Sequence, residues 1–189
     1  MTSPSAADAT NRLLYTPLLA FVLALNSCSV QPPTLALSIL TDKREYRVGD
    51  ALRLETRFSN TGTQTFYLFD DLCWNPGNLL NIHTFNVSGK EVSGRSGFLR
   101  DCLPPPPRPD DTSRFIQLEP GAFEASAEKF DIRELVPEPG EYDLVVYYHS
   151  GISKKWISEY GGPKLDALTI WTSEYPELKS NRLHITVKP

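Results

Sequence analysis

The feature that most constrains this chain is a strict two-residue alternation of apolar and polar side chains. The alternation is clearest in residues 51–59, where Leu52 and Leu54 fall on one face and charged side chains fall on the other. A period of two with one polar face is the pattern of a half-buried antiparallel strand. Residues 141–149 and 180–188 repeat this pattern. These segments predict a fold built on sheets.

Short strand-like segments separated by turn signals fill most of the chain after residue 33. Further strands are predicted at residues 34–40, 65–69, 82–87, 114–118 and 122–130, and one helical turn at residues 131–135. Sixteen prolines and eleven glycines supply the turns between them. Frequent turns between short strands, with almost no predicted helix, indicate an all-β sandwich.

The turn motifs resemble those of bacterial immunoglobulin-like domains. They read Tyr46-x-x-Gly49-Asp50, Asn60-x-Gly62, Leu118-x-Pro120-Gly121, Pro139-Gly140-x-Tyr142 and Ser180-Asn181. Intracellular proteinase-inhibitor-like domains and many bacterial lipoproteins show a similar pattern. The resemblance implies an immunoglobulin-like antiparallel β-sandwich over residues 34–189. We expect Tyr142 to form a tyrosine corner, with its hydroxyl bonded to nearby backbone.

The N-terminal segment has the character of an export signal. Residues 13–25 carry no charge, and Arg12 comes directly before them. This apolar run is shorter than the roughly 20 residues that a membrane-spanning helix needs. Its length is within the range of a signal-peptide apolar region. The sequence therefore predicts an N-terminal signal segment.

The end of this apolar run, Leu25-Asn26-Ser27-Cys28, resembles the lipobox of bacterial lipoproteins. The resemblance implies that residues 1–27 are a signal peptide and that Cys28 carries diacylglycerol and further acyl chains such as palmitate. Two or three acyl chains anchor a protein stably in a bilayer. Residues 28–33 then form an anchor and spacer. Ser29, in place of aspartate, favours the outer membrane. A buried N-terminal helix with an incidental cysteine is the alternative.

If Cys28 carries lipid, two of the three cysteines remain, Cys73 and Cys102. Disulfides persist in an oxidising compartment, so these two are predicted to pair. Closing a loop of about 28 residues would stabilise the fold by roughly 3–4 kcal/mol in the chain-entropy model. Two buried free thiols are the alternative.

The sequence offers little that would support catalysis or metal binding. His83, His149 and His184 each stand alone, and no metalloprotease, nucleophile-elbow or phosphate-loop motif is present. The aspartate pairs at 70–71 and 110–111 are interpreted as solvated turns rather than calcium ligands. A net charge of -4 without a basic block argues against nucleic acid as a partner. We expect no enzymatic activity, no cofactor and no metal site.

Two segments, residues 94–113 and 150–179, depart from the compact pattern. The second is rich in aromatic side chains, and a small hairpin is predicted within it at residues 168–172. Its candidate binding surface consists of Trp156, Tyr160, Trp171 and Tyr175. Aromatic side chains near loops often bind proteins or sugars. The alternative is a small core under a long loop, in which Trp156 and Trp171 simply pack.

These features together predict a non-enzymatic lipoprotein of the bacterial cell envelope, whose domain faces the periplasm or the exterior. It would bind or scaffold an unidentified envelope protein, or a glycan, through loops of the sandwich. A proteinase inhibitor that presents residues 103–110 is one alternative. A carbohydrate-binding module that uses Trp156 or Trp171 is the other.

Overall fold

The computed structural model describes residues 34–70, 80–93 and 107–189, all within the compact unit Gln31–Pro189. Cys28, Cys73 and Cys102 lie outside the described residues, so lipidation and the disulfide stay predictions. Within the part that is described, no helix has the length and apolar character needed to cross a membrane.

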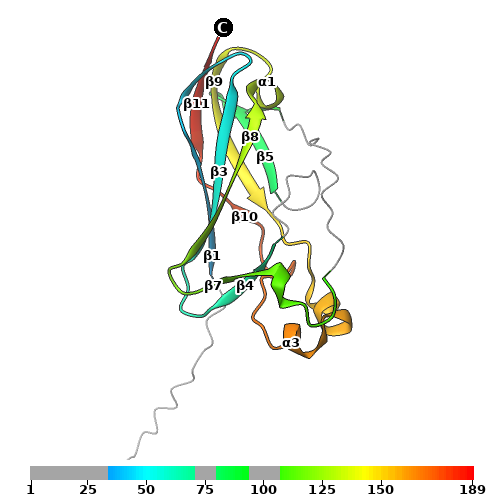
Figure 1. The fold of residues 1–189 in the computed structure, drawn as a ribbon. Helices are drawn as coiled ribbons and strands as arrows, with labels where there is room; N and C mark the ends of the chain where they lie inside the picture. Colours follow the sequence, from blue (N-terminus) through cyan, green and yellow to red (C-terminus); the bar gives the residue numbers. More distant parts are fainter. Residues whose placement is uncertain (1–33, 71–79, 94–106) are drawn as a thin grey trace, which may run out of the picture. The chain divides into compact units, whose positions relative to one another are not determined.

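Two sheets enclose one core (Figure 1). The first has the order β1-β3-β8, with β1 at Leu35–Thr41, β3 at Ala51–Asn60 and β8 at Phe123–Asp131. The second has the order β2-β11-β9-β5-β6, with β10 also paired to β9. Its strands are β2 (Glu45–Arg47), β5 (Leu80–Asn86), β6 (Glu91–Ser93), β9 (Gly140–Tyr148), β10 (Leu178–Lys179) and β11 (Leu183–Lys188). The described ladders are antiparallel except β2 with β11. The chain is thus an immunoglobulin-like β-sandwich, as the sequence predicts.

The alternating side chains form the core between the sheets. On β3, Leu52, Leu54 and Phe58 are buried, and Leu144 of β9 and Ile185 of β11 are buried opposite them. Fully burying one such side chain contributes about 1.5–3 kcal/mol. The alternation read from the sequence therefore gives both the strands and the face that each strand buries.

Two polar contacts fix the course of the chain around this core. The Tyr142 hydroxyl donates to the carbonyl of Glu138 at 2.9 Å, which confirms the tyrosine corner. The Asn181 side chain accepts from the Ile39 amide at 2.8 Å and donates to the Ile39 carbonyl at 3.2 Å. Asn181 lies between β10 and β11, so its side chain joins the edge of β1 to the second sheet.

The predicted helical turn is confirmed as α1, Ile132–Leu135. Asp131 caps it by accepting from the Arg133 amide at 3.0 Å, and its carboxylate also pairs with the Arg133 guanidinium. These hydrogen bonds lower the pKa of Asp131 to about 2. A short polar residue at this position satisfies an amide that the helix leaves without a partner.

The predicted hairpin at residues 168–172 is wrong. Ile170 instead makes an isolated parallel bridge to Tyr67 of β4 (Phe66–Phe69), which pairs with β7 (Phe115–Leu118). The residues before Ile170 are helical rather than extended: α2 is Lys154–Trp156, η2 is Ile157–Gly161 and α3 is Gly162–Asp166. The apolar side chains that suggested a hairpin pack into a separate cluster with these helices.

Candidate functional site

Residues 150–173 form a closed loop that carries the three short helical segments, and we call this loop the helical insert. The Ser150 hydroxyl donates to the Trp171 carbonyl at 3.0 Å, and the Ser173 amide donates to the Ile152 carbonyl at 2.7 Å. These bonds hold the two ends of the loop together. Figure 1 shows α3 at the same end of the sheets as β4 and β7.

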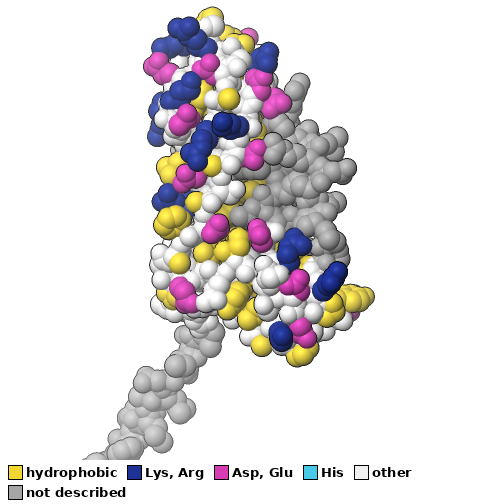
Figure 2. Space-filling view, in the orientation of Figure 1, with side chains coloured by type: hydrophobic (Ala, Val, Ile, Leu, Met, Phe, Trp, Pro, Cys, Tyr) yellow, Lys and Arg dark blue, Asp and Glu magenta, His cyan; other side chains and the backbone are white. Residues whose placement is uncertain are grey.

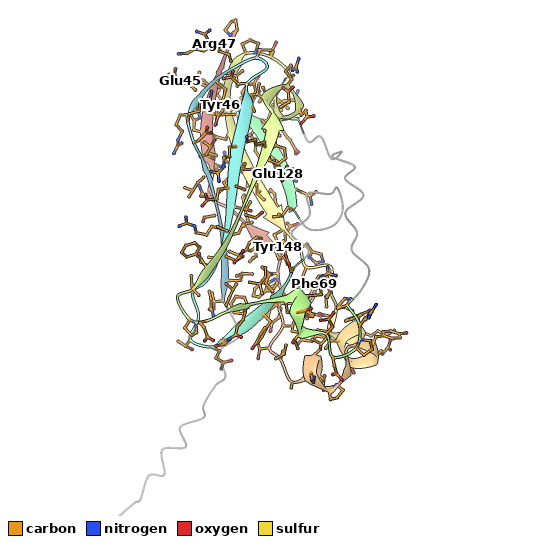
Figure 3. The ribbon with its side chains drawn as sticks, viewed as in Figure 1. Glu45, Tyr46, Arg47, Phe69, Glu128 and Tyr148 are labelled. Carbon is orange, nitrogen blue, oxygen red and sulfur yellow. The ribbon has the colours of Figure 1, made fainter. Side chains whose placement is uncertain are left out.

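The helical insert has its own hydrophobic cluster, apart from the sandwich core. Ile157 and Leu165 pack with Phe69 of β4 and Phe115 of β7, and the two phenylalanine ring centroids lie 5.3 Å apart. In Figure 3, Phe69 lies beside the helices, while Tyr148 lies nearer the strands. The β4–β7 ladder therefore packs against the insert.

The end of the proline-rich segment is fixed to the insert by Asp110. The Asp110 amide donates to the Gly161 carbonyl at 2.7 Å, and its carboxylate accepts from the Lys164 amide at 2.7 Å. Asp110 has a φ of 61°, a left-handed conformation that aspartate adopts more readily than most residues. A β-carbon on Gly162 would lie 2.6 Å from the Asp110 carboxylate, so the close approach depends on glycine there.

A shallow groove, here called the Trp156 groove, runs between this proline segment and the insert. Its volume is about 480 Å³. The ring centroids of Trp156 and Tyr160 lie 6.4 Å apart at 37°, and Tyr160 is 59% exposed. The lining residues are Pro107, Pro109, Trp156, Ser158, Glu159, Tyr160 and Gly162.

The π-helical segment η2 contributes three of the residues that line this groove, Ser158, Glu159 and Tyr160. Its residues Ile157–Gly161 follow directly after Trp156. Single turns of π-helix are rare and are often found at functional sites. The turn buries Ile157 and leaves Tyr160 exposed. One side of the turn therefore packs in the hydrophobic cluster of the insert, and the other side faces the groove.

A second hollow lies on the other side of Ser158, and we call it the Tyr175 pocket. Its volume is about 370 Å³. The Glu174 carboxylate braces its rim by accepting from the Lys154 amide at 3.0 Å. Burial raises the pKa of Glu174, but the hydrogen bonds it accepts outweigh burial and leave the pKa below its usual range. The lining residues are Lys154, Ile157, Ser158, Asp166, Leu168, Thr169, Ile170, Thr172 and Tyr175.

The structure separates the four predicted aromatic residues into two pairs. Trp171 is 4% exposed and belongs to the sandwich core, and the Tyr175 ring stacks on it at 4.4 Å. Trp156 and Tyr160 instead line the groove. On the face shown in Figure 2, hydrophobic side chains lie among lysine and acidic side chains around the insert. Of the predicted surface, Trp171 is buried, Tyr160 is exposed, and Trp156 and Tyr175 are half-buried in the linings of the two hollows.

The other polar candidates are engaged within the chain. His83 Nδ1 lies 2.8 Å from Glu91, and His184 Nδ1 lies 3.0 Å from Asp143, while His149 is exposed. Asp111 caps a short 3-10 turn, η1 (Thr112–Arg114), and Asp110 is bonded to Lys164 as described above. Among the residues described here, no group of three or more possible ligands is placed to hold a metal ion.

The residues that complete the groove carry little signal in the sequence. Pro107 and Pro109 fall within residues 103–110, which the sequence offers as an inhibitor loop, and Ser158 and Glu159 belong to no motif. Gly161-Gly162-Pro163 is a signal that was available, because glycine before proline marks a turn and proline is favoured at the start of a helix. It would have indicated helix in the second inserted segment.

Comparison with known proteins gives no relative that identifies the chain. No family model and no curated protein sequence matches it. A CARDB domain from Pyrococcus furiosus, solved with di-metal ions, is 9% identical with a TM-score of 0.37 over 84% of this chain and 90% of that domain. A β-glucosidase from Listeria innocua, in complex with glucose, is 11% identical with a TM-score of 0.40 over 83% of this chain and 16% of the enzyme.

The sporulation control protein Spo0M from Bacillus subtilis is similar at the same low level. It is 8% identical with a TM-score of 0.40 over 82% of this chain and 49% of that protein. The chain therefore spans about half of Spo0M and a smaller part of the β-glucosidase. At this level of similarity, a function has to be argued from the helical insert itself.

Proposed function

We propose that this chain is a lipid-anchored, non-enzymatic binding module of the bacterial cell envelope, and that it holds an envelope protein in the Trp156 groove. Residues 1–27 would be removed as a signal peptide. Cys28, with its spacer to residue 33, would tether the sandwich of residues 34–189 to the bilayer. The outer membrane is the favoured membrane, and the domain would face the periplasm or the exterior.

The observation that carries this proposal is the exposed Tyr160 ring, which lies beside the half-buried Trp156 on a braced scaffold. Trp and Tyr supply large contact areas with few rotatable bonds, and they are enriched where proteins meet. Tyr160 is 59% exposed, although the neighbouring Ile157 is buried in a packed cluster. A large aromatic side chain held out from a rigid element is well suited to binding.

The proteinase-inhibitor alternative has less support. It requires residues 103–110 to present a free loop to a protease cleft. Pro107 is buried, and Asp110 is bonded to both Gly161 and Lys164. Residues 103–106 lie outside the described part of the chain. The described end of this loop faces the insert, which favours a binding role for the groove.

Site-specific photo-crosslinking in intact envelopes tests the proposal. A photoreactive phenylalanine analogue at position 160 of the full chain should give a protease-sensitive adduct that Trp156→Ala abolishes. Position 123 is the matched control, because Phe123 is 54% exposed and lies on β8. Equal adducts at both positions would contradict the proposal, and an adduct degraded only by glycosidases would mean a glycan partner.

The anchor is tested separately by the mass of the detergent-extracted protein. The proposal expects a chain that begins at Cys28, carries acyl chains, and moves to the soluble fraction in Cys28→Ala. Non-reduced mass also reports the predicted Cys73–Cys102 bridge as a loss of two hydrogens. If the measured mass is that of an unprocessed, unlipidated chain, the proposed anchor and envelope location are contradicted.

A further inference from the structure

The Trp156 groove already contains proline side chains of this same chain. Pro107 and Pro109 line it together with Trp156 and Tyr160. Pro107 is buried, whereas Tyr160 is 59% exposed. Pro107 and Pro109 form the proline wall of the groove, and the same groove includes the exposed Tyr160 ring.

The proline wall is held in place without any ligand. Asp110, one residue after Pro109, is fixed by its amide to Gly161 and by its carboxylate to Lys164, each at 2.7 Å. Proline has a fixed φ near -65° and lacks an amide hydrogen. The groove is therefore preorganised, and preorganisation lowers the entropy lost when a ligand binds.

The groove offers hydrogen-bond donors to a ligand. The Trp156 indole, the Ser158 hydroxyl and the Tyr160 hydroxyl can each donate a hydrogen bond. Among the described lining residues the charged one is Glu159, which also pairs with Lys155 at 3.8 Å. A ligand suited to these donors presents several acceptors.

A proline-rich segment has this chemistry. It forms a polyproline II helix whose backbone makes no internal hydrogen bonds, so its carbonyls stay free to accept. Aromatic-lined grooves recognise such segments because the preformed helix loses little entropy on binding. Glycans also stack on aromatic rings, and an oligosaccharide probe distinguishes them from a proline-rich segment.

We infer that the Trp156 groove binds a polyproline II segment of a partner protein, stacked on the exposed Tyr160 ring beside the proline wall. This inference rests on the proposed function, because it names the partner chemistry of the same groove. Trp156 and Ser158 would donate to the carbonyls of the segment. Asp110 and Gly162 are positioning residues, since they act by fixing the proline wall.

Titration calorimetry with the full chain in detergent micelles tests this inference, with acetylated octaproline amide as the probe. Saturable binding is expected, and Tyr160→Ala should weaken it by about tenfold or more. Trp156→Phe keeps the ring and deletes the indole donor, so it should weaken binding by a smaller factor. Phe123→Ala is the matched control, because it removes an equally exposed ring on β8 and should leave binding unchanged.

A glycine-serine peptide of the same length and a chitin oligosaccharide complete the set of probes. Absence of octaproline binding, or binding that is unaffected by Tyr160→Ala in a folded variant, would overturn the inference. If the position-160 crosslink to a protein persisted in that case, the proposed function would stand without the polyproline partner. Binding of the oligosaccharide in place of octaproline would overturn both.

Discussion

The sandwich and the helical insert are held together in different ways. The sandwich buries alternating side chains of long strands in one shared core, and its ladders run over many consecutive residues. The insert has three short helical segments, four buried side chains in a cluster of six shared with β4 and β7, and ties such as Asp110 to Lys164. A rigid framework with a less stable functional loop is a common division of stability in proteins. This comparison predicts that a destabilising substitution in the sandwich and one in the insert have different measurable effects.

The largest effect is expected in the sandwich, for Leu144→Ala. Leu144 is fully buried in β9, and truncating a buried leucine costs about 2–5 kcal/mol of unfolding free energy. Urea denaturation followed by circular dichroism measures this cost. Leu40→Ala is the control, because Leu40 is 46% exposed and should change stability by only about 0.5 kcal/mol. If the two substitutions lowered the unfolding free energy equally, the assignment of Leu144 to the core would be contradicted.

Leu165→Ala is the matching change in the insert, where Leu165 is also fully buried. The local cost should be similar, about 2–5 kcal/mol, but the insert can open while the sandwich stays folded. Hydrogen exchange should therefore show faster exchange in residues 152–170 and retained protection in β3, β9 and β11. Uniform loss of protection would mean that the two regions unfold as one unit, and the comparison would fail.

Gly162→Ala should detach the proline segment from the insert. Gly162 has a φ of 78°, and its added β-carbon would meet the Asp110 carboxylate. Gly89→Ala is the control for a positive φ, because Gly89 has a φ of 77° and nothing within 4 Å of an added β-carbon. Gly162 has a ψ of 169°, in a region that is essentially restricted to glycine, so alanine there costs about 1–3 kcal/mol. Faster exchange of the Asp110 amide is expected in Gly162→Ala alone, and the same change in both variants would refute the contact.

The smallest effect concerns pH and belongs to the sandwich. Hydrogen bonds from Arg133 lower the pKa of Asp131 from 3.8 to about 2 in the folded state. Its contribution to stability is therefore complete above about pH 4 and is lost as the pH falls from 3.8 toward 2. Thermal unfolding of wild type and Asp131→Asn should differ at pH 6 and converge near pH 2. A constant difference across this range would contradict the shifted pKa.

Sequence alone was sufficient for the sandwich because its signal is local. Leu52 and Leu54 on one strand, or Leu183 and Ile185 on another, show their buried face within a few residues. The insert depends on partners distant in sequence: Leu165 packs with Phe69 and Phe115. No periodic pattern within residues 150–173 indicates these distant partners. The sequence there therefore predicts a hairpin, which the structure does not contain.

Only part of the candidate site can be predicted from the sequence, for the same reason. Composition showed that aromatic residues gather after residue 150, but not which side of the chain each one faces. Trp171 is buried in the core with the half-buried Tyr175 stacked on it, whereas Trp156 and Tyr160 line the groove. The left-handed Asp110 that fixes the proline wall is a tertiary feature, since its partners are Gly161 and Lys164.

Asn181 has a consequence for how this protein behaves at high local concentration. A side-chain amide carries the same donor and acceptor as a peptide group, and Asn181 presents both to Ile39 in the manner of a neighbouring strand. An open strand edge is a template for pairing with another molecule, and proteins that crowd a surface meet such edges often. By occupying the middle of β1, one asparagine interrupts that template and opposes the self-association of neighbouring copies into continuous sheets.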